Sequence, residues 1–207
     1  MKQKMKMISD DRLSSIYQSV KTFYDEDHTG HGWDHIVRVE RLALKIAGIE
    51  NEGNESLIRL LVYLHDAGDA KLHNDQQAAD EFLMNIIRKA GFNESETQLL
   101  LSESGAIGFS KAKTPETVEG RIVQDADRLD AIGAVGIARA FTYGAVKRNA
   151  FYSEHQPEDT VIQHFYDKLL TLRDRMNTKT AIKIAHERHR FMEQFIGQFI
   201  KEWNGKK

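Results

Sequence analysis

The sequence predicts an all-α protein that folds as a single compact domain. Apolar residues recur every three or four positions in one segment after another, which is the spacing of one buried helix face. Few segments alternate polar and apolar residues, so strands have little support. Proline, which interrupts helices, occurs only twice, as Pro115 and Pro157. A chain of 207 residues is long enough for one sizeable core.

Apolar stripes in the first half of the chain indicate four helices. The stripes are Leu13, Ile16, Val20 and Phe23; Ile36, Val39, Ala43 and Ile46; Leu57, Leu60, Leu61 and Leu64; and Phe82, Ile86 and Ile87. Gly91 is expected to close the fourth helix, because glycine readily adopts the left-handed conformation found at helix C-termini. Asn93 and Glu96 have the spacing of a capping box, so a fifth helix should begin there.

A loop is expected to separate the two halves of the chain. It runs from Gly105 to about Lys113, in the segment GAIGFSKAKTPET. Thr114 is then expected to be an N-cap, with Pro115 at the first helical position. Helical spacing continues from there to about Arg148, as one helix or two.

A second loop, NAFYSEHQPED, precedes the C-terminal part, and Pro157 is again placed to start a helix. Two long amphipathic segments follow it. They are TVIQHFYDKLLTLRDRM and TAIKIAHERHRFMEQFIGQFIKEW, joined near Asn177-Thr178. The chain shows no internal repeat and no low-complexity linker, which favours one helical domain over 1–207.

Composition excludes several classes of protein. The hydrophobic fraction of 41% is that of a globular chain. No apolar run approaches the roughly 18 residues that cross a bilayer, and the N-terminus MKQKMKMISD lacks the apolar stretch of a secretory signal. A formal charge of −2 gives no basic excess for nucleic acid. The absence of cysteine excludes disulfides and thiolate sites. A cytoplasmic protein without membrane or nucleic-acid partners is expected, and the oligomeric state stays open.

Polar residues interrupt three of the apolar segments. His65 and Asp66 stand side by side in LVYLHDAGDAKLH, His35 precedes the buried stripe that starts at Ile36, and Asp127 lies among apolar residues in GRIVQDADRLDAIGA. Burial of such groups is costly unless they are paired or bind a cation. Each residue alone is more often a hydrogen-bonded core or capping group, but several on different apolar helices suggest convergence.

Two imidazoles and two carboxylates form a mixed nitrogen and oxygen donor set. Such a set suits Mn, Fe, Zn or Mg-like ions and leaves positions open for water and substrate. Adjacent residues of a helix point about 100° apart, so His65 and Asp66 reach one ion only if it lies against the helix end. The other ligands must then come from other helices, as His35 and Asp127 would.

The order His35, His65-Asp66, Asp127 resembles the H…HD…D signature of the HD-domain metal-dependent phosphohydrolases. The flanks HIVRV, LVYLHDAGD and ADRLD match as well, and the likeness covers roughly residues 20–190. The C-terminal YDKLLTLRDRMNT and AHERHRFM are similar to a small bacterial single-domain branch that includes nucleotide pyrophosphohydrolases.

The resemblance implies an all-α fold with a divalent metal between its central helices. By motif position the metal ligands are His35, His65, Asp66 and Asp127. Mn²⁺ is the expected ion, with Mg²⁺, Fe²⁺, Ni²⁺ and Zn²⁺ as alternatives. The implied chemistry is hydrolysis of a phosphoester or phosphoanhydride. Asp130, one turn after Asp127, is the alternative fourth ligand, and Asp127 is preferred because it fits the ADRL position.

Other charged residues near the motif are candidates for catalysis. Asp69 corresponds to an acidic residue that orients or deprotonates the attacking water in many relatives, although it is one methylene shorter than the usual Glu; it could instead cap or support the turn. Lys71 is placed to hold a phosphate, or is a solvated surface lysine. Arg38 lies one turn after His35, where it could contact phosphate or pair with Asp69.

Three further residues are candidates for substrate binding. His31 lies in the glycine-containing loop HTGHGWDH, where it contacts substrate or caps the next helix. Arg128 and Lys168 could neutralise phosphates, although Arg128 faces away from Asp127 and could form a structural pair. Most charges such as Lys168 face solvent.

The sequence favours an enzyme that acts on a phosphorylated small molecule, expected to be a nucleotide. The preferred reaction converts a nucleoside or deoxynucleoside triphosphate into a monophosphate and pyrophosphate. The nearest alternative is a nucleoside 5′-monophosphatase. An alternative of another class is a non-catalytic nucleotide-sensing module, which the complete ligand set disfavours.

Overall fold

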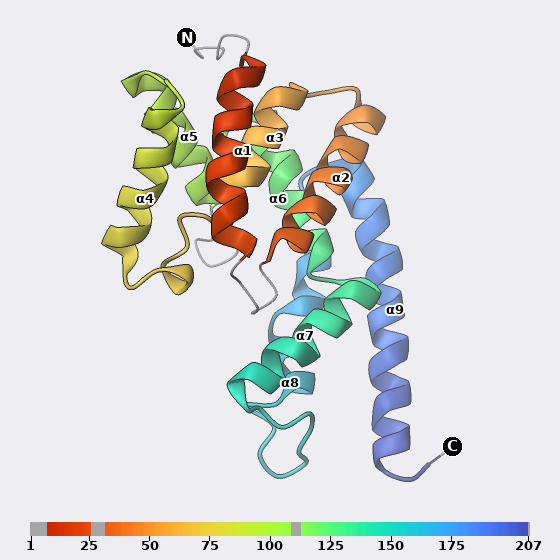
Figure 1. Ribbon diagram of the computed structural model, residues 1–207. Helices are drawn as coiled ribbons and strands as arrows, with labels where there is room; N and C mark the ends of the chain where they lie inside the picture. Colours follow the sequence, from red (N-terminus) through yellow and green to blue (C-terminus); the bar gives the residue numbers. More distant parts are fainter. Residues whose placement is uncertain (1–7, 26–31, 109–112, 207) are drawn as a thin grey trace. The chain divides into compact units, whose positions relative to one another are not determined.

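Helices are the only regular elements among the residues that the computed structural model describes, which are 8–25, 32–108 and 113–206 (Figure 1). This confirms the all-α prediction. The chain divides into two compact units, Met1–Ala126 and Asp127–Lys207, and the division falls inside the continuous helix α6 (Val118–Asp130). The interpretation as one domain stays a prediction.

The first unit is built around its third helix. Its helices are α1 (Asp10–Asp25), α2 (Trp33–Glu50), α3 (Glu55–Leu64), the short 3-10 helix η1 (Ala70–Leu72), α4 (Gln76–Lys89), α5 (Glu94–Ile107) and most of α6. Leu57, Ile58 and all residues from Leu60 to Leu64 are buried, and α3 packs against α1, α2 and α5. A helix that is apolar nearly all round can exist only inside other helices. The end of α3 is therefore fixed in the core.

The helix ends of this unit follow the predicted capping chemistry. The Asn93 side chain accepts a hydrogen bond from the Glu96 backbone, and the Glu96 carboxylate accepts one from the Asn93 backbone, so the capping box is confirmed. Gly91 follows α4 with φ of +81°, the left-handed conformation expected of it. Asn54 and Asp75 cap α3 and α4 in the same manner.

The predicted start of the sixth helix is wrong. The helix begins at Val118, and Pro115 lies before it as a buried loop residue. The reason is the buried carboxylate of Glu103, which accepts hydrogen bonds from the backbone N–H groups of Glu116 and Thr117 and from the Thr117 hydroxyl. Thr117 Oγ1 in turn accepts from the Gly120 N–H, so Thr117 caps the helix. The end of the preceding helix also differs, because α5 continues through Gly105 to Ile107.

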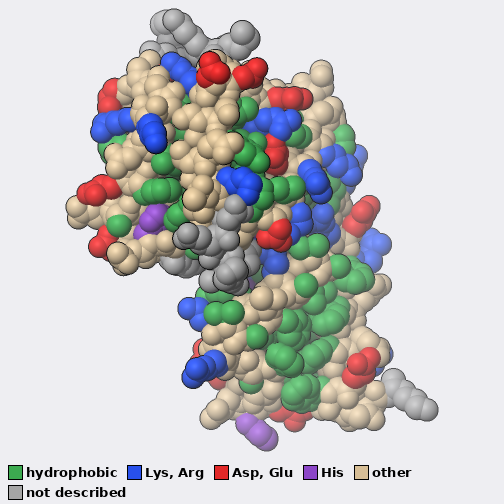
Figure 2. Space-filling model, viewed as in Figure 1, with side chains coloured by type: hydrophobic (Ala, Val, Ile, Leu, Met, Phe, Trp, Pro, Cys, Tyr) green, Lys and Arg blue, Asp and Glu red, His purple; other side chains and the backbone are tan. Residues whose placement is uncertain are grey.

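The second unit contains the end of α6 and the C-terminal helices. These are α7 (Gly133–Lys147), α8 (Val161–Asp167), the 3-10 helix η3 (Leu169–Arg175) and α9 (Lys179–Trp203). Helix α9 packs against α7 and η3. Aromatic rings join the helices, as in the pairs Phe141–Phe195 and Phe165–Phe195. Apolar side chains also reach the surface over the region of α7 and α9 (Figure 2).

Two details of the second unit differ from the sequence-based expectations. Pro157 does not start α8, because its carbonyl accepts the N–H of Thr160 in a turn and Thr160 then caps the helix. The first predicted amphipathic segment is not one helix, since it changes from α8 to η3 at Lys168. The predicted junction at Asn177-Thr178 is confirmed, with Thr178 as the N-cap of α9.

Arginine side chains fix the C-terminal end of α6 within the second unit. Arg139 forms an ion pair with the buried carboxylate of Asp130 at 2.6 Å. Arg188 donates to the Leu129 carbonyl at 2.5 Å. Gly133 has φ of +79°, and an added Cβ would lie 3.0 Å from the Arg188 side chain. Burial lowers the pKa of Arg188, although the charge of Asp130 opposes this shift. The last turn of α6 is therefore held from several sides.

Truncation of Leu60 to alanine should destabilise the first unit strongly. The side chain is fully buried in α3, so Leu60→Ala should cost about 2–5 kcal/mol of unfolding free energy through lost apolar contact and a cavity. Ile49→Ala is the control, because Ile49 is 60% exposed and its truncation should change the free energy by less than about 0.5 kcal/mol. Urea unfolding followed by circular dichroism measures both. Equal midpoints for the two variants would contradict this role of α3.

Candidate metal centre

His35 is buried at the beginning of α2. The helix starts at Trp33 after Gly32, whose carbonyl accepts the N–H of His35 at 2.9 Å. His35 has no exposed surface and adjoins Ile36 and Val39, which belong to the core. The amphipathic pattern that buries this face of α2 thus carries the imidazole into the interior with it.

His65 and Asp66 lie where α3 ends. His65 is the C-cap of α3, and the chain turns through Gly68 toward η1. The Nδ1 atom of His65 lies 2.7 Å from the Val62 carbonyl oxygen. A carbonyl oxygen can only accept, so Nδ1 carries the proton and donates, and Nε2 of the neutral ring carries the lone pair. This is how histidines that bind metals are commonly oriented.

The carboxylate of Asp66 lies between the two imidazoles. Its Oδ2 atom is 3.5 Å from Nε2 of His35 and 3.5 Å from Nε2 of His65. These distances exceed a strong charged hydrogen bond. They suit ligands of a shared ion, because atoms that each lie about 2.1 Å from one metal are roughly 3.0–3.4 Å apart. Each of these three residues is exposed over less than one tenth of its surface.

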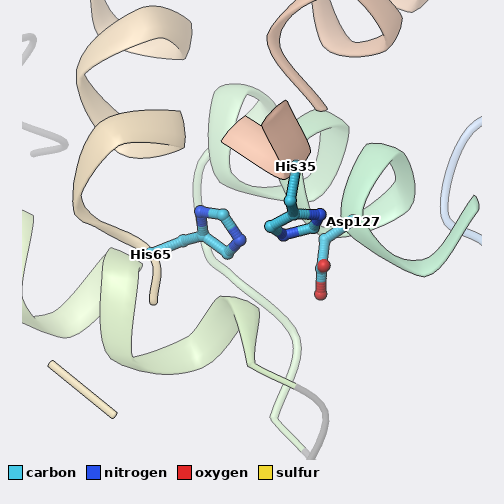
Figure 3. Close-up of side chains that lie close together, drawn as sticks. All are labelled: His35, His65 and Asp127. Atoms are coloured by element: carbon cyan, nitrogen blue, oxygen red, sulfur yellow. The ribbon is translucent and has the colours of Figure 1, made fainter. Parts of the chain in front are cut away.

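Asp127 joins the same group of side chains from α6. One ligand atom each of His35, His65 and Asp127 lies within 4.8 Å of the others (Figure 3). Asp127 stands one residue beyond the division between the units, but on the unbroken helix that carries Ile122 and Val123 of the first unit. The structure therefore brings together residues that α2, the turn after α3 and α6 contribute.

The alternative ligand Asp130 has a different environment. Its carboxylate is 2.6 Å from the Arg139 guanidinium, and the cluster of possible ligands contains Asp127 instead. The preference for Asp127 agrees with this geometry. Arg128 is 9% exposed and donates to the carbonyl of Arg175, a contact within the fold, and its role in substrate binding stays a prediction.

Asp69 lies in the turn that follows the ligands. Its backbone N–H donates to the Asp66 carbonyl at 3.0 Å, and its carbonyl accepts from Leu72. These bonds fix the backbone of Asp69 close to the ligand residue. The side chain lines a cavity together with His65 and Asp66.

The remaining predicted residues are placed as follows. Arg38 forms an ion pair with Asp34 at 2.5 Å. Partial burial opposes the charge on Asp34, but the hydrogen bond and charge of Arg38 outweigh it and lower the pKa of Asp34. Lys168 lies in the second unit between α8 and η3. Lys71 belongs to η1, and its side chain lies outside the described part of the structure, as does all of His31.

A cavity of about 300 Å³ begins at the ligand turn and extends between α4 and α5. Its lining includes the apolar side chains of Leu83, Met84 and Leu101. It also includes Gln76, Asp80, Gln98 and Ser104. Sequence reasoning missed this cavity, because polar residues on amphipathic helices are expected to face solvent.

His73, which the sequence left without a role, holds the turn between the ligands and η1. Its Nε2 atom lies 2.8 Å from the carbonyl oxygen of Ala67. Its ring stacks on Phe23 with a centroid separation of 5.0 Å and also contacts Phe82. The recurrence of His after the HD pair was visible in the sequence, but its partner, a backbone carbonyl, leaves no trace in a sequence.

Comparison with known proteins identifies the family. The model of the HD domain matches residues 32–132, which include all four predicted ligands. Bacillus subtilis YpgQ is 36% identical over 190 residues, which are 90% of this chain and 91% of YpgQ. The chain belongs to the HD-domain family. The resemblance read from the H…HD…D signature is thereby confirmed, and the HD model ends close to the last predicted ligand.

Solved structures of HD-domain relatives cover nearly the whole chain. A Lactobacillus plantarum protein is 33% identical with a TM-score of 0.84, covering 97% of this chain and 100% of its own. An HD-superfamily hydrolase from Bacillus thuringiensis is 38% identical with a TM-score of 0.74, covering 94% and 100%. YpgQ in complex with ADP is 35% identical with a TM-score of 0.75, covering 93% and 96%. These similarities support assignment of the protein as a hydrolase of the HD superfamily.

In the part of the chain that the structure describes, no helix taken singly has both the length and the apolar character to cross a membrane, while the bent pair of α6 and α7 meets these criteria by length and composition only.

Removal of a clustered side chain should weaken metal binding. Loss of a residue that hydrogen-bonds to a metal ligand typically weakens metal binding about 10–100-fold. His65→Ala and Asp127→Ala remove proposed ligands themselves, so each should raise the Mn²⁺ dissociation constant by more than that. His186→Ala and Asp10→Ala are controls, because both residues are exposed and outside the cluster. Isothermal titration calorimetry with Mn²⁺ measures all four. Unchanged affinity in either cluster variant would remove that residue from the ligand set.

The hydrogen bond of His73 can be tested without loss of its ring packing. His73→Phe keeps an aromatic ring beside Phe23 and removes the bond to the Ala67 carbonyl. The looser turn should weaken Mn²⁺ binding by about tenfold, as is usual for residues that support metal ligands. His155→Phe, at an exposed position, is the control. The same Mn²⁺ affinity in the His73 variant and the wild type would show that the turn keeps its shape by other means.

Proposed function

We propose that this protein is a metal-dependent hydrolase that converts a nucleoside or deoxynucleoside triphosphate into a monophosphate and pyrophosphate. The observation that carries the proposal is the buried convergence of His35, His65 and Asp127, with an Asp66 oxygen 3.5 Å from both imidazoles. Burial of so many polar groups is costly unless a cation unites them.

His35, His65, Asp66 and Asp127 are the proposed ligands of a divalent ion. Mn²⁺ is the proposed ion, and Mg²⁺, Fe²⁺, Ni²⁺ or Zn²⁺ also accept a set of two imidazoles and two carboxylates. The orientation of His65, fixed by its bond to Val62, supports this assignment because it turns the lone pair of Nε2 toward Asp66. When bound, the ion supplies Lewis-acid polarisation of a phosphoryl oxygen and makes water more acidic.

The proposed substrate is a nucleotide. YpgQ, which matches this chain over most of both lengths, has been crystallised with ADP. In the reaction, a water oxygen bonds to the α-phosphorus, the bond from that phosphorus to the bridging oxygen breaks, and pyrophosphate leaves. Cations near the phosphates would absorb the charge of the departing group.

Asp69 is the proposed residue that orients the water and accepts its proton. The backbone hydrogen bond from Asp69 to Asp66 supports this role, since it holds Asp69 one turn from a proposed ligand. Arg38, Lys71 and Lys168 are the proposed contacts to phosphate, and His31 is a proposed contact to the substrate. Arg128 stays in this set, although its guanidinium already bonds the Arg175 carbonyl.

Phosphorus NMR on the Mn²⁺-loaded protein tests the proposal with a panel of nucleoside triphosphates. Pyrophosphate and monophosphate should appear together. Asp66→Ala should lower the rate by at least about a hundredfold, because metal polarisation supplies several kcal/mol of transition-state stabilisation. Asp10→Ala, an exposed aspartate of α1, should keep the wild-type rate. Chelation should abolish turnover, and added Mn²⁺ should restore it.

Other products would replace the proposal with its alternatives. Orthophosphate released from nucleoside monophosphates, without pyrophosphate from triphosphates, would identify a 5′-monophosphatase. Binding of metal and nucleotide with no product from any of them would indicate a nucleotide-sensing module.

A further inference from the structure

The cavity between α4 and α5 is continuous with the candidate metal centre. His65 and Asp66, two of the proposed ligands, form part of its wall, and Asp69 stands beside them. One of the groups bonded to a phosphorus atom at the metal could thus extend into this space. The cavity volume of about 300 Å³ is at the lower end of the range for small-molecule sites, enough for part of a nucleotide.

Attack at the α-phosphorus limits what can enter the cavity. The α-phosphorus carries the nucleoside through one oxygen and the pyrophosphate leaving group through another. In an in-line displacement the leaving group lies opposite the attacking water, so these two substituents extend from the centre in different directions. The cavity can hold one of them, and its chemistry decides which.

The lining of the cavity is unsuited to phosphates. Among the described residues that form it, three are carboxylates, namely Asp66, Asp69 and Asp80, and none is Lys or Arg. A polyphosphate there would lie beside these carboxylates, and no Lys or Arg among the described lining residues would offset its negative charge. Carboxylate and amide oxygens instead accept hydrogen bonds from sugar hydroxyls and base amino groups.

Apolar and amide side chains line the same space. Leu83 and Met84 come from α4, and Leu101 comes from α5. Gln76 donates to Asp80 at 2.7 Å, which fixes both side chains at the edge of the cavity. A concave apolar lining with a few oriented polar groups is the usual environment of a bound small organic group such as a base.

We infer that this cavity receives the nucleoside portion of the substrate, with the phosphates directed away from it. The inference rests on the proposed hydrolysis at the α-phosphorus. It assigns selectivity for the base and sugar to α4 and α5, whereas the metal ligands come from α2, the turn after α3 and α6.

Titration calorimetry on the Mn²⁺-loaded protein tests the inference with two probes, adenosine 5′-monophosphate and inorganic pyrophosphate. Leu101→Trp fills the cavity from α5. It should weaken monophosphate binding at least about tenfold, since a pocket that encloses a ligand supplies much of its affinity. Pyrophosphate binding should stay within about twofold of the wild type, because no phosphate enters the cavity. Ser102→Trp, the exposed neighbour on α5, is the control and should change neither.

A second pair of variants does not depend on tolerance of a larger side chain. Asp80→Lys places a cation at the cavity wall, and Glu81→Lys places one on the exposed neighbouring position of α4. If the inference is right, Asp80→Lys does not tighten pyrophosphate binding more than Glu81→Lys does. Tighter pyrophosphate binding confined to Asp80→Lys would assign the cavity to phosphates and overturn the inference.

The other possible results of these titrations also support or overturn the inference. Unchanged monophosphate affinity in Leu101→Trp, or equal loss for both probes, would overturn the inference. A different experiment tests the proposed function. If the wild type releases no pyrophosphate in the phosphorus NMR assay, the proposed function is wrong. Loss of monophosphate affinity in Leu101→Trp in a protein that makes no pyrophosphate would support the nucleoside site and refute the reaction.

Discussion

The hydrogen bond between His65 Nδ1 and the Val62 carbonyl is the interaction on which the candidate centre depends. Helix α3 leaves its last carbonyls without helical partners, as every helix does, and a buried helix end must satisfy them inside the protein. His65 satisfies one of them with its own ring, and in doing so it directs Nε2 toward Asp66 and His35. The same bond thus completes the helix end and orients the proposed ligand.

The surrounding structure holds this arrangement through backbone atoms. His73 binds the carbonyl of Ala67, and Asp69 donates its N–H to Asp66. Helix α3 supplies the fixed base for the turn, because its residues from Leu60 to Leu64 are buried. A turn fixed at so many points can present charged side chains with little loss of conformational entropy on binding.

Much of the centre was predictable from sequence because it violates a simple rule. Polar residues such as His35 and Asp127 stand where the helical pattern demands apolar ones, and that conflict marks functional positions. The elements themselves were predictable for similar reasons, since apolar periodicity and the Asn93–Glu96 capping box are local signals. The H…HD…D order then supplied the family, which the comparisons confirm.

The features that the sequence did not reveal depend on contacts between distant segments. Glu103 accepts hydrogen bonds from the backbone of Glu116 and Thr117, so α6 starts at Val118 instead of the predicted Pro115. The residues around Pro115 give no sign of this distant contact. The cavity could not be predicted, because Asp80 and Gln98 lie on the polar faces of amphipathic helices, which are expected to contact solvent. A wall built from several helices becomes recognisable only when those helices are packed.

The far wall of the cavity comes from α4 and α5, whereas the candidate metal ligands come from other elements, and this has an evolutionary consequence. Residues such as Met84 and Leu101 can change size or polarity without altering α2 or the turn that carries His65. Amino-acid substitutions on α4 and α5 can therefore change which substrate fits, while the candidate metal ligands stay the same. Such modularity gives a small helical scaffold a route to diverge among related phosphate esters without rebuilding its chemistry at each step.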